Sequence, residues 1–200
     1  MTLSLASMTD MMFDLAGDSL PADYHVALWH ELVRIEPALA HDGRIGLLPL
    51  RTAETGELHL LPKRAKLTLR VPHEQAQATL ALVGARLDVS GHPIILGAGK
   101  SRPLQPYPTL HAHLVAGDTD EVVFMQQVVA ELAELGVQAQ SICGRPGRLC
   151  DGGRTIAGFS LVLHDLKPEA SLRLQCAGMG KARHYGCGVF VPYKAISSLE

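Results

Sequence analysis

The 200-residue sequence has few cysteines, few aromatic residues and no long apolar run. No apolar stretch approaches the ~18 residues that a membrane-spanning helix needs. The N-terminal segment has no basic stretch of the kind that opens a secretory signal. Four cysteines are too few and too far apart for a disulfide scaffold. We therefore expect a cytoplasmic protein that makes no contact with a membrane.

The cysteines also lack the spacing of a metal site. Cys143 and Cys150 lie seven residues apart, Cys176 and Cys187 lie eleven apart, and there is no CxxC pair. Structural zinc sites usually contain such pairs. We expect these cysteines to be small buried residues, and we expect no bound metal and no cofactor.

Charge is unevenly distributed along the chain, although the net charge is only −2. Residues 1–40 hold six acidic residues and one basic residue, whereas residues 41–117 hold nine basic and five acidic residues. Residues 170–199 hold four basic residues and no acidic one. Because a polyanion responds to a local patch and not to the sum, this distribution is compatible with a nucleic-acid partner. Ordinary scatter of surface charge is the alternative.

Hydrophobic periodicity predicts a similar order of strands and helices in both halves of the chain, with one additional short strand in the first half. The first half has predicted strands at 11–16, 45–50, 57–61, 66–71 and 85–89, with helices at 23–36 and 73–83. The second half has predicted strands at 110–114, 137–143, 156–163 and 188–191, with helices at 119–135 and 167–174, the first of them capped by Thr119. The proline-rich stretch 102–108 separates the two halves.

This β-α-β-β-α-β order predicts an α+β protein with two tandem ferredoxin-like domains. We place the N-terminal domain at residues 1–101 and the C-terminal domain at residues 109–200. The sequence Gly-Ala-Gly-Lys-Ser at 97–101 resembles part of a phosphate-binding P-loop, but the first glycine of that motif is replaced by Ile94. We expect a basic turn between the domains there.

A glycine-rich segment near the C-terminus is the strongest local signal. Gly178, Gly180, Gly186 and Gly188 form two G-x-G pairs that are separated by five residues. Glycine is needed where φ is positive or where a backbone approaches a ligand closely. The five residues between the pairs include Lys181, Arg183 and His184. Such a loop can offer backbone N–H groups and cations to phosphates, and a plain flexible loop is the alternative.

The segment G-h-G-x-x-x-x-x-G-h-G resembles the signature of the CRISPR repeat-RNA processing endoribonucleases, the Cas6 family of the RAMP superfamily. Supporting segments follow in order along the chain, among them FDLAG at 13–17, HVALWH at 25–30, KLTLRVP at 66–72 and GCGVFVP at 186–192. The resemblance implies two ferredoxin-like domains and cleavage of precursor CRISPR RNA within its repeat, beside a hairpin. It also implies that the guide RNA hairpin is retained, together with other subunits of a CRISPR effector complex.

RNA carries its own nucleophile, the 2′-OH beside the scissile phosphate. Its attack leaves a 2′,3′-cyclic phosphate and a 5′-OH, and it needs proton transfer and charge stabilisation but no metal. His25 opens the motif H-x-x-L-W-H, which resembles the first-helix motif of one branch of the family, where the leading histidine is catalytic. The adjacent Tyr24 is a candidate helper, and His41 is the second candidate histidine. A partly buried packing histidine is the alternative for His25.

Basic residues supply the predicted RNA-binding surface. The first group lies on the predicted strand 66–71 and in the segment just before it, which also contains Lys63. The second group lies in a predicted hairpin, and the third is the glycine-rich loop. The members are Arg64, Lys66 and Arg70, then Arg145, Arg148 and Arg154, and finally Gly178, Gly180, Lys181, Arg183, His184, Gly186 and Gly188. A non-catalytic subunit that binds an RNA hairpin is the main alternative function. A small-molecule enzyme that binds phosphate leaves the basic strand and hairpin unexplained.

Overall fold

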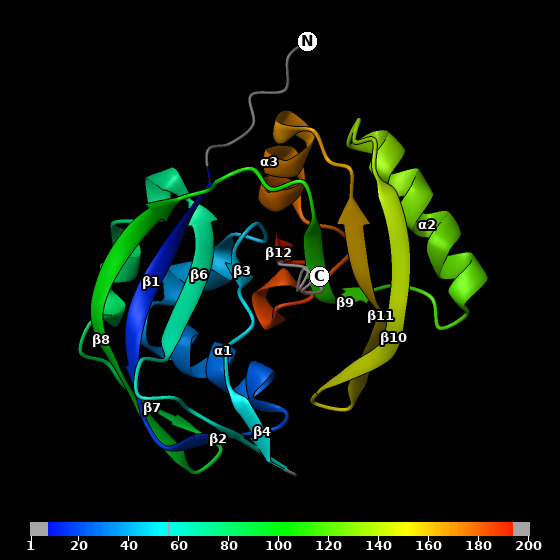
Figure 1. Cartoon of the computed structure of the whole chain (residues 1–200). Helices are drawn as coiled ribbons and strands as arrows, with labels where there is room; N and C mark the ends of the chain where they lie inside the picture. The colour runs from blue at the N-terminus through cyan, green and yellow to red at the C-terminus, as the bar shows by residue number, and fades with distance from the viewer. Residues whose placement is uncertain (1–7, 56, 194–200) are drawn as a thin grey trace, which may run out of the picture.

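The computed structural model describes residues 8–55 and 57–193, which form two large antiparallel sheets and one small one, with helices packed against them (Figure 1). The first sheet has the order β3 (Gly46–Leu47), β6 (Lys66–Pro72), β1 (Met8–Ala16), β8 (His92–Pro103) and β7 (Arg86–Val89). The second has the order β10 (Gln140–Asp151), β11 (Arg154–His164), β9 (Leu110–Ala116) and β12 (Val191–Pro192). A small third sheet contains β2 (Ser19–Pro21), β5 (Leu58–Leu60) and β4 (Ala53–Thr55).

The helices lie on both sides of the second sheet. Figure 1 shows α1 (Tyr24–Ile35) in the middle of the molecule, whereas α2 (Glu121–Glu134) covers the outer side of β10 and β11. The third helix, α3 (Pro168–Ala177), lies above the place where the two sheets approach each other. No helix within the described part of the chain is long and apolar enough to cross a membrane.

Two hydrophobic clusters stabilise the sheets. The first lies between α1 and the first sheet, where Leu67, Leu69 and Val71 of β6 are fully buried, as their alternation predicts. The second lies between α2, α3 and the second sheet. The first cluster also contains Leu149 of β10 and Tyr185 of the 3₁₀ turn η4 (Arg183–Tyr185). Residues from the second half of the chain therefore complete the hydrophobic cluster of the first sheet.

The predicted helix at 73–83 is wrong. The segment forms two short 3₁₀ turns, η2 (His73–Gln75) and η3 (Ala78–Leu82). Only Thr79 and Leu82 of these turns are buried, so packing contributes little to stabilising a continuous α-helix, which is marginal at this length. The predicted cap of α2 is also displaced by one residue, because Asp120 accepts from the amides of Val122 and Val123.

The predicted turn at 97–101 is wrong as well, because these residues lie inside the long strand β8. Its glycines and prolines are signals against a strand. The glycines are needed because β8 runs close to β1. A Cβ added to Gly99 would lie 2.7 Å from Cε1 of Phe13, and one added to Gly97 would lie 2.9 Å from Cβ of Asp14.

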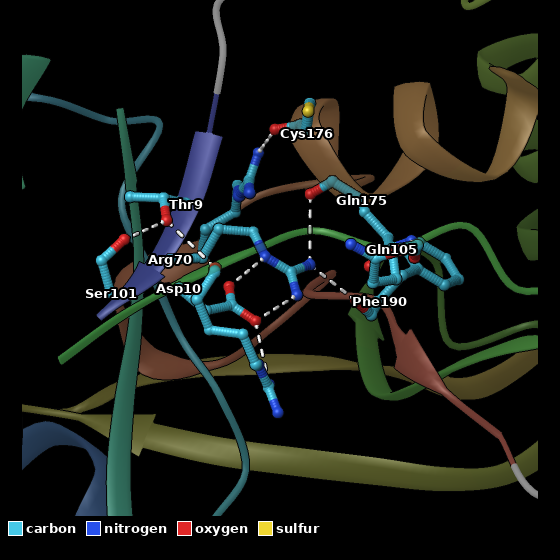
Figure 2. Close-up of polar contacts among 10 residues, drawn as sticks. Thr9, Asp10, Arg70, Ser101, Gln105, Gln175, Cys176 and Phe190 are labelled. Atoms are coloured by element: carbon cyan, nitrogen blue, oxygen red, sulfur yellow. Dashed lines mark hydrogen bonds and ion pairs between the residues drawn. The ribbon is translucent and has the colours of Figure 1, made fainter. Parts of the chain in front are cut away.

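A buried ion pair joins the first sheet to the second half of the chain (Figure 2). Asp10 lies directly opposite Arg70 on β6 and opposite Arg102 on β8. Nε and Nη2 of Arg70 donate to the two oxygens of the Asp10 carboxylate at 2.8 and 3.2 Å. Nη1 of Arg70 donates to the carbonyls of Gln175 at 3.2 Å and Phe190 at 2.7 Å. Since Arg70 is 1% exposed, the prediction that it binds RNA is wrong: the second half of the chain covers it.

Removal of the buried partner should destabilise the protein far more than removal of the exposed one. Arg70→Ala leaves the Asp10 carboxylate buried without its main partner, and we expect it to lower the free energy of unfolding by about 3–5 kcal/mol. The side chain of Arg102, which pairs with the same carboxylate, is 56% exposed. We therefore expect Arg102→Ala to lower the free energy of unfolding by only about 0–1 kcal/mol. Urea unfolding of the two variants tests this. Equal losses would show that the Arg70 contacts do not hold the two halves together.

Candidate active site

His25 lies in the first turn of α1, stacked on Tyr24. The two ring centroids are 4.1 Å apart and the ring planes differ by 18°. Tyr24 is 3% exposed, and its hydroxyl accepts from the amide of Leu50 at 3.4 Å. Burial raises the pKa of Tyr24 to about 12. Tyr24 is thus a buried residue with a protonated hydroxyl, and its ring stacks on that of His25. Its role as a helper in catalysis stays a prediction.

The surroundings of His25 favour its neutral form. Burial lowers the pKa of His25 to about 4, and repulsion from His59 and His113 acts in the same direction, whereas Asp23 opposes it. A neutral imidazole has a free lone pair on one nitrogen and can accept a proton. His25 is thus able to act as a base in the free protein at neutral pH.

Two of the neighbouring histidines were not predicted from the sequence. His59 lies on β5, and its ring meets that of Tyr24 edge-on with the centroids 5.6 Å apart. His113 lies on β9 of the second sheet, 4.7 Å from His111 between ring centroids. Both are distant from His25 in sequence, and no spacing rule connects them. Only the packing of α1 between the sheets brings them together.

The four glycines of the loop adopt positive φ angles of +68°, +69°, +92° and +64° at Gly178, Gly180, Gly186 and Gly188. A Cβ at Gly188 would lie 1.7 Å from the carbonyl oxygen of Met179. All four glycine amides already donate within the protein, to Leu174 O, Glu131 Oε2, Arg183 O and Leu114 O respectively. The prediction that these four N–H groups face phosphates is therefore wrong. The glycines permit the tight course of the loop.

The glycine-rich loop lies against the beginning of α1. A Cβ added to Gly186 would lie 3.8 Å from Cδ2 of His25. His184 contacts Trp29 of α1 with ring centroids 5.3 Å apart. The hydroxyl of Tyr185 donates to Asp151 of the β10–β11 hairpin at 3.0 Å. His25 is therefore close to the loop, and the loop in turn is joined to the hairpin.

Arg183 is 7% exposed, which makes the prediction that it contacts RNA wrong for this conformation. Its Nη1 donates to the carbonyls of Cys176, at 2.8 Å, and Ala177, at the end of α3. Nε and Nη2 find no acceptor among residues 8–55 and 57–193. Burial lowers the pKa of Arg183 to about 10, and repulsion from Arg70 adds to this effect. Arg183 binds the end of α3 and so anchors the loop.

His41 does not lie with His25. It ends the 3₁₀ turn η1 (Pro37–His41), which follows the C-terminal end of α1, and it is exposed. His25 is in the first turn of that helix. Twelve residues of α-helix span about 18 Å, so the two histidines stand at opposite ends of α1 and are not two parts of one site.

These features of sequence and geometry agree with the comparisons with known proteins. A family model described as "Cas6 Crispr" matches residues 9–195. The chain belongs to the Cas6 family.

Relatives of this Cas6-family chain support the assignment. A protein of Myxococcus xanthus (strain DK1622), the "CRISPR-associated endonuclease Cas6", is 37% identical over 191 residues, which cover 94% of this chain and 83% of the relative. A solved structure of a "CRISPR associated protein Cas6" has a TM-score of 0.66 at 10% identity and covers 94% of this chain and 100% of its own. Another, "An RAMP protein binding different RNA substrates", has a TM-score of 0.64 at 13% identity, with 91% of this chain and 98% of its own covered. The likeness to solved structures confirms a mixed α/β fold with antiparallel sheets.

The basic residues of this Cas6-family chain do not form one strip. Arg64, like Lys63, is exposed in the segment before β6, and Lys66 is exposed but pairs with Asp14. Arg70 is buried between the halves of the chain, as described above. The predicted continuous strip on this strand is therefore wrong, because its exposed members all precede the buried Arg70.

The hairpin arginines lie on two faces of the second sheet. Arg148 pairs with Ala157 across β10 and β11, whereas Arg154 pairs with Asp151. Positions an odd number of residues apart on a strand point to opposite faces. Arg154 therefore lies on the face of Asp151, which carries the contact with Tyr185, and Arg148 lies on the other. Arg145, Arg148 and Arg154 are all exposed.

The cysteines are free thiols, of which Cys187 is buried and Cys150 is exposed. The prediction of burial is thus wrong for Cys150. Among the residues that the structure describes, no group of three or more His, Cys, Asp and Glu side chains is placed to hold a metal ion.

Proposed function

We propose that this protein is an endoribonuclease that cleaves precursor CRISPR RNA within the repeat and keeps the guide RNA hairpin. The observation that carries the proposal is the position of His25 beside the glycine-rich loop of a Cas6-family chain, where burial lowers the pKa of its imidazole. The 37% identical relative, named as an endonuclease, supports it. The strand orders β3-β6-β1-β8 and β10-β11-β9-β12 support two ferredoxin-like domains at residues 1–101 and 109–200.

The proposed reaction is a metal-independent transesterification. His25 takes the proton of the 2′-OH, the 2′ oxygen attacks the adjacent phosphorus, and the bond to the 5′ oxygen breaks. The products are a 2′,3′-cyclic phosphate and a 5′-OH. Binding of the phosphate raises the pKa of His25, because the phosphate charge favours the protonated imidazole. His25 then becomes a stronger base where the RNA is bound than in the free protein.

The proposed RNA surface includes the exposed cations around the site. Lys181 is exposed in the glycine-rich loop, and Arg154 lies on the face of the hairpin that is joined to this loop. Arg64, Arg145 and Arg148 extend the positive charge outward, where phosphates of a hairpin stem are recognised by position and shape. Other subunits of a CRISPR effector complex are the further partners that we propose.

The reaction is tested with the cognate repeat RNA in excess EDTA. We expect cleavage to persist, because the RNA supplies the nucleophile, its 2′-OH, and the protein supplies the base, His25. Neither group needs a metal ion. A single 2′-deoxy substitution at the cut site should abolish cleavage and leave binding unchanged. Loss of activity on chelation with recovery on adding magnesium would contradict the mechanism. Tight binding without cleavage of the unmodified RNA would favour the non-catalytic binding subunit.

The base is identified by the contrast between His25, at the start of α1, and His41, which lies beyond the end of this helix in η1. His25→Ala should slow single-turnover cleavage by about 10²–10⁴-fold, the usual effect of losing a general base, with RNA affinity little changed. His41→Ala, as the matched control, should cost less than about tenfold, near 1.4 kcal/mol in barrier. The reverse pattern would assign catalysis to His41, away from the glycine-rich loop.

The orientation of the RNA is tested through the salt dependence of binding. Arg154→Ala removes a cation on the face that is joined to the loop, and it should reduce the log–log slope of affinity against salt by roughly 0.7–0.9. Arg86→Ala removes the same charge from β7, at the far edge of the first sheet (Figure 1), and it should leave the slope unchanged. Equal slopes for the two variants would mean that RNA does not cross this face of the hairpin.

A further inference from the structure

Two histidine rings contact the same buried ring. Tyr24 stacks on His25 with an angle of 18° between the planes and meets His59 edge-on at 81°. Because Tyr24 is buried and its hydroxyl accepts from the amide of Leu50, its ring is held in place and contacts both imidazoles. His25 lies on α1 and His59 on β5, so side chains from two separate elements meet at the Tyr24 ring.

His59 is oriented by a hydroxyl. Its Nδ1 lies 2.8 Å from Oγ1 of Thr52. A hydroxyl can donate to a neutral Nδ1 and can accept from a protonated one. The contact with Thr52 therefore holds the ring in both protonation states and leaves Nε2 to exchange a proton elsewhere. A histidine that is held through one nitrogen in this way is suited to proton transfer through the other.

The electrostatics separate the roles of the two rings. The pKa of His25 falls to about 4 because of burial first and then because of repulsion from His59 and His113, with Asp23 opposing. A proton on His59 therefore favours the neutral form of His25. Transesterification of RNA needs this division, with one neutral group to accept the 2′-OH proton and one protonated group to supply a proton to the leaving oxygen.

We propose that His59 is the second catalytic residue of the site, the general acid that protonates the leaving 5′ oxygen, and that Thr52 positions it. This inference rests on the proposed function. The 2′-OH proton passes to His25, the bond between the 2′ oxygen and phosphorus forms, and the bond from phosphorus to the 5′ oxygen breaks. The proton on Nε2 of His59 passes to that oxygen. One proton enters the protein and one leaves it, and exchange with water restores both histidines.

The test is a repeat RNA in which sulfur replaces the bridging 5′ oxygen at the cut site. A thiol has a pKa of about 8.5, so a thiolate leaves without being protonated, whereas an alkoxide does not. His59→Ala should slow cleavage of the oxygen-linked RNA by about 10²–10⁴-fold and that of the sulfur-linked RNA by less than about tenfold. His25→Ala should slow both, since the base acts on the 2′-OH in either substrate.

Matched variants separate catalysis from packing. His92 forms the same kind of imidazole–hydroxyl pair, with Nδ1 3.0 Å from Oγ of Ser19 on β2 of the small sheet, and His92→Ala should cleave both RNAs at the wild-type rate. Thr52→Val should cause a partial loss on the oxygen-linked RNA that the sulfur relieves, and Thr52→Ser should restore the rate. His59→Gln keeps a polar side chain of similar size and replaces His59→Ala if the latter binds RNA poorly.

Three results would overturn the inference. Equal losses on both RNAs in the His59 variants would assign His59 a packing role, while the proposed function would stand. A loss relieved by sulfur in His113→Ala, with none in His59→Ala, would make His113 the acid. Absence of cleavage of either RNA by the unmodified protein would remove the proposed function and this assignment together.

Discussion

The geometry of the molecule depends on one buried guanidinium. Arg70 uses Nε and Nη2 for the Asp10 carboxylate and Nη1 for the carbonyls of Gln175 and Phe190. A buried ion pair contributes little net stability, because desolvation offsets most of the attraction, but it is costly to break. It therefore acts chiefly on orientation. Only one placement of the second half of the chain supplies both carbonyls, and that placement sets the loop against α1.

Arg183 repeats this bonding pattern in part. Its Nη1 also binds carbonyls, those of Cys176 and Ala177, while burial and Arg70 both disfavour its charge. Together the two arginines bind the last turn of α3 and Phe190, which lies between the loop and β12. The glycines between these anchors give a backbone that can turn sharply without side-chain overlap. The position of His184 and Gly186 beside α1 follows from these anchors.

The sequence predicted the parts of the fold that local pattern determines. Helix α1, strand β6 and the glycine-rich loop were predicted near their observed positions, because periodicity and glycine spacing are local signals. Strand β8 was missed, since its glycines are explained only by contact with Phe13 and Asp14 of β1. His25 could be singled out from the motif that it opens. His59 and His113 could not, because their proximity to His25 is produced by three separate elements. The alternation of β6 showed correctly that Arg70 points away from its own core, but it contained no information about what covers that face.

The shared core has a consequence for the order in which the chain is made. All strands of the first sheet have been synthesised once residue 103 is added. Their hydrophobic cluster nevertheless includes Leu149 and Tyr185. Synthesis proceeds from the N-terminus at about 5–20 residues per second. Part of the apolar surface of the first sheet is therefore exposed for several seconds, until Leu149 and Tyr185 have been synthesised. Its core closes only when the glycine-rich loop has arrived, so a nascent chain that has acquired its final core has acquired the loop as well.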